Sequence, residues 1–314
     1  MPHITRLQKE RLAELKKEVT RPGFDRHAFR LSDAGELPPD LQAPYVAELA
    51  GRGAIQNIVV FPAQIQRGWH YVPKQALLFT ATGIIHLLAS IRPDQEPQVT
   101  IIHACGLLYL KATLLLLYGY LEIAAQGQDS PARLGMEFNT VSWGAISASL
   151  RRFMQAGRTT SSIPADRTVY SPNARQVFER LPLKYFNGVQ LYGLLPGEEL
   201  EELVFQKSTF RRRLHFLRRP VTPDTLLMLT TNYMVVIQED LKLRVGWILS
   251  YIPRNGICRL QSQARGLWTE LIVQIKQQDQ SAHCKFLLAK QAVDAWHMQW
   301  IAHGGQWQDI PMNA

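Results

Sequence analysis

The sequence predicts a mainly β protein of the α+β class, built from two copies of one folding unit and preceded by an N-terminal helix. Two observations carry this prediction. Residues 73–87 and 223–237 share an apolar register without a gap, so one stretch echoes the other 150 residues later. Both stretches sit among short apolar runs bounded by turn residues, and each series of runs ends in one amphipathic helical pattern. Self-similarity at a fixed offset indicates duplicated structure.

The N-terminal part of the chain precedes the first copy. Apolar residues recur among charged ones over residues 3–19, and Pro22 and Gly23 end this pattern, which predicts an amphipathic helix. Residues 20–50 are polar and Pro-rich, with one short helix expected over residues 41–50.

The first copy is expected to contain a series of strands and one closing helix. The strands are expected over residues 55–62, 77–88 (a hairpin), 99–103, 107–112, 114–124 and 134–138. Asn139 or Thr140 caps the helix that follows. Trp143, Ile146, Leu150 and Phe153 recur at steps of three and four, which predicts one apolar helix face.

The second copy repeats this order after a linker over residues 157–200. Within the linker, Ser171 followed by Pro172 predicts a short helix. The strands of the second copy are expected over residues 203–205, 226–237 (a hairpin), 252–260, 271–273 and 286–288. Trp296 and Trp300 follow Ile146 and Leu150 by 150 residues, and each is expected to bury about 150–250 Å² against the end of the sheet.

The composition is that of a folded protein with a basic surface. The 314 residues are 46% apolar and 19% charged, which suits two buried cores. The formal net charge of +9 favours anionic partners such as a phospholipid surface or nucleic acid. Residues 151–219 hold 13 Lys and Arg against 6 Asp and Glu, so +7 of that charge lies mid-chain.

Three features predict a cytoplasmic location, with peripheral association at a membrane as the alternative. Cys105, Cys258 and Cys284 lack zinc-site or disulfide spacing, so we expect buried free thiols in a reducing compartment. The charged N-terminal helix has no apolar signal-peptide core. Lys111 and Glu122 interrupt the apolar segment of residues 99–125 and leave only ten uninterrupted apolar or small residues between them, against about 20 needed to cross a bilayer. We therefore interpret that segment as buried strands.

Three short motifs carry a resemblance to a known family. They are a Leu-Pro-Gly-Glu entry at residues 195–198, an apolar hairpin at residues 227–233 and an Ile-Pro-x-x-x-Ile strand at residues 252–257. With the tryptophan-bearing last helix, they resemble the bacterial branch of the pleckstrin-homology-like (PH-like) domains. This resemblance covers residues 195–305 and, through the repeat, residues 49–155. It implies two PH-like β-barrel or sandwich domains, each closed by a C-terminal amphipathic helix.

The domain organisation follows from this resemblance and from the repeat. It comprises an N-terminal helix and lead-in (residues 1–48), PH-like domain 1 (49–156), a linker with a short helix (157–194), PH-like domain 2 (195–307) and a tail (308–314). The first copy departs from the family pattern. Arg52 and Gly53 replace the acidic entry, and His103 replaces the strand proline.

Catalytic and cofactor signatures are missing from the sequence. It contains no Gly-x-Ser-x-Gly, no His-Glu-x-x-His, no phosphate-binding loop and no complete dinucleotide-binding glycine motif. His103 and Cys105 alternate onto one strand face without a further ligand pair for a metal. Glu122, Glu137 and Glu270 are isolated, so we interpret them as solvated or paired carboxylates. We predict a non-enzymatic protein with no catalytic residue, metal or cofactor.

The strongest functional signal is the basic segment of residues 207–219, which has six cations and no acid in thirteen residues. The candidate anion- or lipid-headgroup-binding residues are Lys207, Arg211, Arg212, Arg213, Arg218 and Arg219. Guanidinium forks match phosphate oxygens. The spacing of Lys207, Arg211 and Arg213 also resembles the basic motif of lipid-binding pleckstrin-homology domains. The alternative is a solvated edge strand, whose charges prevent aggregation. The first copy has only Arg67 in the corresponding region.

Three functions compete on this evidence. The leading prediction is a binding or adaptor protein that docks on an anionic membrane surface or an acidic protein partner through the basic segment. The second is nucleic-acid binding through the same segment, which is disfavoured because only Phe210 and Phe216 are available to stack on bases. The third is an assembly scaffold that recruits a protein through exposed edge strands or the N-terminal helix.

Overall fold

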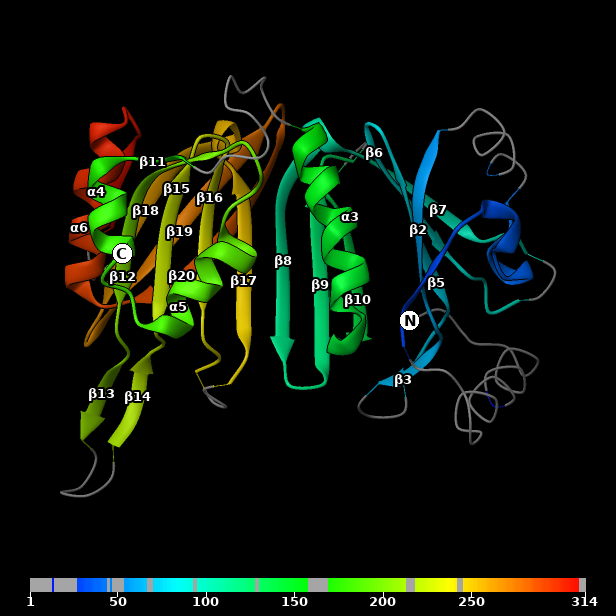
Figure 1. The fold of residues 1–314 in the computed structure, drawn as a ribbon, viewed down its shortest axis with the longest axis horizontal. Helices are drawn as coiled ribbons and strands as arrows, with labels where there is room; N and C mark the ends of the chain where they lie inside the picture. Colours follow the sequence, from blue (N-terminus) through cyan, green and yellow to red (C-terminus); the bar gives the residue numbers. More distant parts are fainter. Residues whose placement is uncertain are drawn as a thin grey trace. The chain divides into compact units, whose positions relative to one another are not determined.

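The computed structural model divides into two compact units (Figure 1). It describes residues 13, 27–43, 46, 54–66, 70–92, 95–127, 130–157, 169–212, 218–241 and 245–310. Unit 1 comprises residues 1–105, 117–120 and 136–157, and unit 2 comprises residues 106–116, 121–135 and 158–314. The predicted N-terminal helix and the short helix expected over residues 41–50 fall almost entirely outside the described residues, as does the tail after residue 310.

The chain is mainly β, as the sequence predicts. The strands before the linker are β1 (Phe29–Leu31), β2 (Ile55–Phe61), β3 (Gln64–Gln66), β4 (His70–Val72), β5 (Gln75–Thr80), β6 (Gly83–Leu88), β7 (Gln98–His103), β8 (Leu107–Leu115), β9 (Tyr118–Ala125) and β10 (Ala132–Asn139). The later strands are β11 (Val169–Tyr170), β12 (Glu199–Gln206), β13 (Thr209–Arg212), β14 (Arg218–Thr222), β15 (Thr225–Thr230), β16 (Tyr233–Gln238), β17 (Trp247–Pro253), β18 (Ile257–Arg265), β19 (Trp268–Gln277), β20 (Gln280–Leu288) and β21 (Trp307–Ile310).

Four α-helices lie within the described residues. They are α3 (Trp143–Ala156), α4 (Pro172–Phe178), α5 (Leu183–Gly188) and α6 (Lys290–Ala302). Ser171 caps α4, because its hydroxyl accepts a hydrogen bond from the backbone N–H of Ala174 at 3.1 Å. Asn139 accepts one from the N–H of Val141 at 3.0 Å, in the turn that precedes α3. The predicted start of α4 is confirmed, whereas Asn139 caps the 3₁₀ turn η4 (Thr140–Ser142), and Ser142, the N-cap residue of α3, makes no capping hydrogen bond through its side chain.

The duplicated pattern reappears in the element bounds. Shifting β5, β6 and β8 by 150 residues gives the bounds of β15, β16 and β18, and the 3₁₀ turns η3 (Ala104–Gly106) and η6 (Arg254–Gly256) are related in the same way. The closing helices α3 and α6 start at Trp143 and Lys290, so shifting α3 by 150 residues places its start three residues, or less than one helical turn, after the start of α6. The two copies therefore share one order of strands followed by one helix.

The strands form open sheets. A five-stranded sheet has the order β1-β2-β5-β6-β7, an eight-stranded sheet has the order β10-β9-β8-β17-β16-β15-β12-β11, and a four-stranded sheet has the order β20-β19-β18-β21. The pairs β3-β4 and β13-β14 form separate hairpins. No sheet of the described residues closes into a barrel, which corrects the barrel expectation. The reason lies in unit 2, where β17 pairs with β8 instead of closing onto a strand of its own copy.

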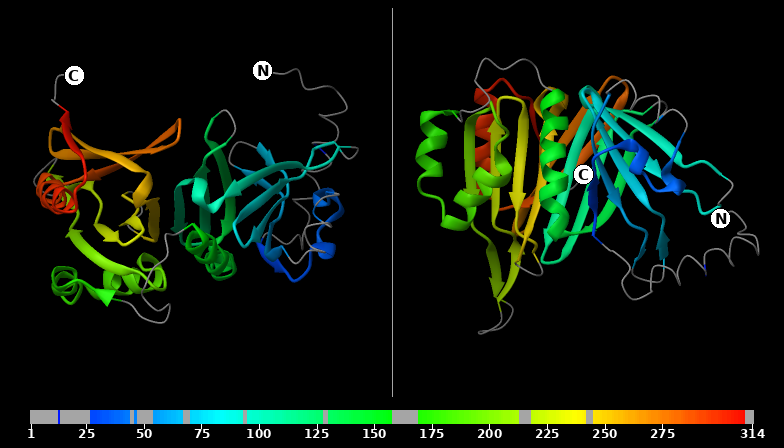
Figure 2. Two further views of the ribbon diagram at one scale, coloured as in Figure 1. Left: turned by 90° about the horizontal axis from the view of Figure 1, so that it is seen from above. Right: turned by 45° about the vertical axis from the view of Figure 1, so that its right-hand side comes forward.

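The core of unit 2 lies between its two sheets and α6. Leu227 and Ile252 come from one sheet, Val273 and Phe286 from the other, and all four are 5% exposed or less. Trp296 and Trp300 from α6 are 1% and 5% exposed in the same core, and α6 packs on β12 and β19 (Figure 2). The predicted burial of both tryptophans is confirmed, although they fill a sandwich and do not plug a barrel.

Unit 1 has a core on each side of its five-stranded sheet. One core contains Leu41, Ile58 and Leu78 together with the lead-in residues before β2. On α3, Ile146, Leu150 and Phe153 are 2% exposed or less, and the helix packs on β2, β5 and β6. The predicted apolar helix face is confirmed. The lead-in strand β1, which pairs antiparallel with β2, was not expected.

Two other expectations need correction. Cys105 and Cys258 are exposed, because Cys105 lies in a 3₁₀ turn and Cys258 falls at a register shift in β18. Only Cys284 is partly buried, and burial raises the pKa of its thiol to about 12. The apolar segment around Leu116 forms strands, with a turn between β8 and β9 at a position where a continuous strand was expected. No helix of the described residues is long and apolar enough to span a membrane.

Candidate functional site

The basic segment folds as the hairpin β13–β14, which we call the basic hairpin. Figure 1 and the right-hand view of Figure 2 both show it extending past the ends of β12 and β15, away from the sheet that these strands join. It forms a two-stranded sheet of its own. The segment is therefore a projecting hairpin and not the edge of a larger sheet.

The base of the hairpin is held by a buried polar side chain. Gln206 is 6% exposed and donates through Nε2 to Thr222 Oγ1 at 3.0 Å and to the carbonyl of Pro223 at 3.1 Å. Its Oε1 accepts from the backbone N–H of Ala289 at 2.7 Å, at the N-cap of α6. Because a buried amide with all these partners is costly to displace, Gln206 fixes the hairpin base to the body of unit 2.

A second set of contacts supports the base from α5. Asp224 accepts a hydrogen bond from the backbone N–H of Ser208, across the base of the hairpin. Burial, together with the carboxylates of Asp224 and Glu239, raises the pKa of the adjacent Tyr185 phenol. Lys184 pairs with Glu239, and its ammonium lies 4.8 Å from the ring centroid of Trp247. These contacts order α5 beside the point from which the hairpin projects.

The register of the hairpin pairs its arginines across the two strands. Arg211 lies opposite Arg219, and Arg212 lies opposite Arg218. The Arg211 side chain is exposed, and so is that of Lys207 just before the hairpin. Arg213 lies outside the described residues, and only the strand positions of Arg212, Arg218 and Arg219 are described. The structure thus brings four of the six sequence-predicted cations into two cross-strand pairs.

The first copy forms the same hairpin without this charge. Its strands β3 and β4 pair Gln64 with Val72, Ile65 with Tyr71 and Gln66 with His70. Arg67 lies outside the described residues. A hairpin at this position therefore belongs to the repeated fold, whereas the cross-strand arginine pairs occur in the second copy and are not required to form the hairpin.

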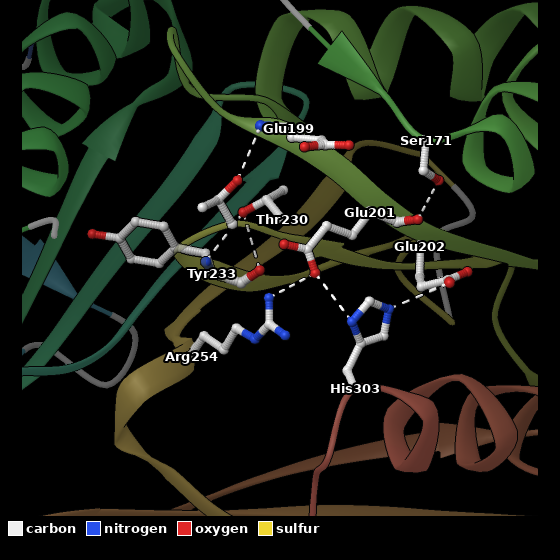
Figure 3. A network of polar contacts seen from close by, with 9 residues as sticks. Ser171, Glu199, Glu201, Glu202, Thr230, Tyr233, Arg254 and His303 are labelled. Atoms are coloured by element: carbon white, nitrogen blue, oxygen red, sulfur yellow. Dashed lines mark hydrogen bonds and ion pairs between the residues drawn. The ribbon is translucent and has the colours of Figure 1, made fainter. Parts of the chain in front are cut away.

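A separate polar network, not anticipated from the sequence, joins three parts of unit 2 (Figure 3). Glu201 Oε2 lies 2.7 Å from Arg254 Nη1 and 3.3 Å from His303 Nδ1. The other ring nitrogen of His303 lies 3.4 Å from Glu202 Oε1. The network ties β12 to the turn after β17 and to the residue that ends α6.

A β-bulge explains how two consecutive glutamates reach one histidine. The register of β12 against β15 shifts between Leu200 and Glu202, so Glu201 is the extra residue of the bulge. Successive side chains of a regular strand point to opposite faces, and a bulge redirects one of them. The only sequence signal is the acidic run at residues 198–202, in which adjacent charges give no hint of a shared partner.

The chemistry available to this network is ion pairing. Each carboxylate already contacts a cationic or hydrogen-bonding side chain, and Ser171 Oγ donates to the backbone carbonyl of Glu201 at 2.5 Å. Among the described residues, no group of three or more His, Cys, Asp or Glu side chains is arranged to hold a metal. We therefore infer that the network holds the end of α6 against β12.

The isolated carboxylates found in the sequence are paired. Glu122 accepts a hydrogen bond from the hydroxyl of Tyr109 at 2.5 Å, and Glu137 accepts one from that of Tyr118 at 3.2 Å. Glu270 lies 3.6 Å from the ammonium of Lys285, and Arg265 is nearby. The interpretation of these residues as paired carboxylates is confirmed.

Comparisons with protein-family models and with curated proteins give no match. Among solved structures, the chain is similar to the hSac2 domain from human phosphoinositide phosphatase Sac2, with 11% sequence identity and a TM-score of 0.25. That match covers 46% of this chain and 93% of the Sac2 chain. A likeness at this TM-score supports no argument about fold or activity.

Proposed function

We propose that this chain is a non-enzymatic binding protein with two PH-like copies, and that its basic hairpin docks on an anionic membrane surface. The observation that carries this proposal is the cross-strand pairing of Arg211 with Arg219 and of Arg212 with Arg218. The repeated order of strands followed by one helix supports the PH-like assignment.

The pairing has an electrostatic cost that an anionic partner relieves. Like charges directly opposite one another destabilise an antiparallel pair. The hairpin of the first copy forms without such pairs, so its fold does not need them. Phosphate groups placed against the hairpin would offset the repulsion, and guanidinium groups bind them through paired hydrogen bonds. The arginine pairs are therefore better explained by an anion than by protection of a sheet edge.

A projecting hairpin suits a surface better than a small, enclosed ligand. Gln206 fixes the base of the hairpin. Lys207 and Arg211 are exposed, and the neighbouring Phe210 is 42% exposed. Cations near an anionic bilayer contribute about 1 kcal/mol each, and an aromatic side chain suits the interface. An anionic membrane is therefore the expected partner, and binding to nucleic acid is the alternative outcome of the test.

The test replaces Arg211, Arg212, Arg218 and Arg219 with Gln and measures binding to phosphatidylserine-containing vesicles at low salt. Four cations at about 1 kcal/mol each predict a loss of roughly a thousandfold in affinity. Added salt should weaken binding of the parent protein steeply, because the attraction is screened within about 10 Å at 0.1 M ionic strength.

The control variant removes the same charge elsewhere, by replacing the exposed Arg133, Arg152, Lys276 and Lys290 with Gln. It should keep most of its affinity for the vesicles. Equal losses in both variants would show that net charge alone drives binding, against the proposal. Binding of the parent to short duplex DNA but not to vesicles would replace the membrane with nucleic acid.

A further inference from the structure

The two copies use equivalent strand edges in different ways. In unit 2, β17 pairs antiparallel with β8 through residues 247–251 and 110–114. The 150-residue offset makes β7 the equivalent of β17, and β18 the equivalent of β8. Because β17 pairs with β8, the equivalent strands β7 and β18 have edges that are suited to pair with each other in the same way.

The edge of β18 is occupied by the last strand of the chain. β21 pairs parallel with β18, placing Trp307 to Ile310 opposite Leu260 to Gln263. Residues 260–263 are the 150-residue equivalents of residues 110–113, which pair with β17. The C-terminal strand thus covers the part of β18 that corresponds to the interface on β8.

The attachment of β21 is short and largely polar. It comprises four residue pairs, and Gln308 and Asp309 are exposed. Asp309 Oδ1 accepts from Ser262 Oγ at 2.5 Å and from Trp307 Nε1 at 3.0 Å, and these hydrogen bonds lower the pKa of its carboxyl. The Trp307 ring stacks on His297 at 4.5 Å. By contrast, β17 pairs with β8 through Leu249, Ser250 and Tyr251, which are 4% exposed or less.

The edge of β7 is the last of its sheet within the described residues. Residues 98–103 contain no Lys, Pro, Asp or Glu, the residue types that commonly protect a strand edge from pairing. Ile101 is 55% exposed, whereas its equivalent Tyr251 is 4% exposed beside β8. An exposed, uncharged, β-branched edge is a template for pairing with another strand.

We propose that β18 is an acceptor for β7 of a second copy of this chain, and that β21 occupies the acceptor until that copy displaces it. The expected register repeats the one between β17 and β8, with Ile101 opposite Leu260 and Val99 opposite Ser262. Such an interface joins different surfaces of the two copies, so each added chain presents a new β7 edge and association continues head to tail.

The first test loosens β21 in the full-length chain by combining Trp307→Ala with Asp309→Ala. These changes remove the ring stacking and the hydrogen bond from Ser262. The apparent affinity is proportional to the fraction of molecules in which β21 has left β18. Loosening β21 raises this fraction and therefore strengthens self-association. We expect sedimentation velocity over a series of concentrations to give roughly a tenfold lower dissociation constant than the parent.

Two further substitutions in the loosened variant locate the donor. Ile101→Lys places a charge on the β7 edge and should return the protein to monomers. Val141→Lys, at a site that is 72% exposed in the same unit, should leave association unchanged. If Ile101→Lys has no more effect than Val141→Lys, then β7 is not the donor. Association that does not depend on concentration also contradicts pairing between two copies.

A peptide experiment on the unmodified protein does not depend on the folding of any variant. A synthetic peptide of residues 97–103 should slow hydrogen–deuterium exchange at residues 260–263 and speed it at residues 307–310. The same peptide with Lys in place of Ile101 should do neither. An unchanged exchange pattern at residues 260–263 at saturating peptide would overturn the proposal.

Discussion

His86 shows how one residue can make the stability of unit 1 depend on pH. It lies on β6 with 6% of its surface exposed, and its Nε2 lies 2.9 Å from Gln75 Oε1. Burial lowers the pKa of its imidazole from 6.5 to about 4. In the second copy, the equivalent residues are Val236 and Thr225, and neither side chain titrates in this pH range.

The sign of the pH effect follows from these pKa values. As the pH falls below about 6.5, the histidine is protonated in the unfolded state but stays neutral in the folded state until the pH reaches about 4. The free energy of unfolding therefore keeps its full value above about pH 6.5 and decreases as the pH falls towards 4. A shift from 6.5 to about 4 corresponds to about 3 kcal/mol. We expect the free energy of unfolding to fall by about that amount from this residue between about pH 7 and about pH 4.

The measurement is urea unfolding of the full chain at several pH values. The variant that combines His86→Val with Gln75→Thr takes the residues of the second copy and should lose this part of the pH dependence. The same slope in parent and variant would mean that folding does not lower the pKa of His86.

At the scale of one element, α6 combines attachment at its end with burial along its length. Trp296 and Trp300 are buried, His303 binds Glu201 and Glu202, and Trp300 Nε1 donates to the carbonyl of Gln306 at 3.1 Å. The helix therefore connects the core of the sandwich, the bulge in β12 and the approach to β21.

We expect Trp300→Ala to lower the free energy of unfolding of unit 2 by about 3–5 kcal/mol, because a large buried side chain leaves a cavity. Met298→Ala, at a position that is 72% exposed on the same helix, should change it by less than about 0.5 kcal/mol. Thermal and urea melts of both variants provide the comparison. A Trp300→Ala loss below about 1 kcal/mol would mean that α6 contributes little to the core.

At the scale of the whole molecule, unit 2 is assembled from segments that are far apart in the sequence. It takes in residues 106–116 and 121–135, which precede the linker. Leu108, Tyr109 and Ala124 lie in its core cluster with the residues of the second copy. The boundaries of the two compact units therefore differ from the boundaries of the two sequence copies.

This arrangement predicts that residues 158–314 are incomplete on their own. Without β8, the edge of β17 is uncovered, and the core loses Leu108 and Tyr109. Burial of each such side chain contributes about 1.5–3 kcal/mol, so we expect a fragment of residues 158–314 to be at least about 3 kcal/mol less stable than one of residues 106–314. Its uncovered edge should also cause self-association.

Urea unfolding and sedimentation velocity of the two fragments test this prediction. If residues 158–314 are monomeric and as stable as residues 106–314, then β8 is dispensable to the unit.

The sequence by itself determined the features that depend on local pattern. Alternating and helical spacing located most strands and α3 and α6, Ser171 and Pro172 marked the start of α4, and the offset of 150 residues related the two copies. It also located the arginines of the basic hairpin, because like charges that are close in sequence are visible without a fold.

Only the tertiary structure decided which strand edges meet and which side chains share a partner. The residues near Leu110 and Tyr251 do not predict that β8 pairs with β17, because the backbone hydrogen bonds that join two strands do not depend on residue type. The bulge at Glu201 and its link to His303 join residues about 100 positions apart, and the pairing of Arg211 with Arg219 depends on the hairpin register. These features arise from long-range pairing, which a pattern of near neighbours does not encode.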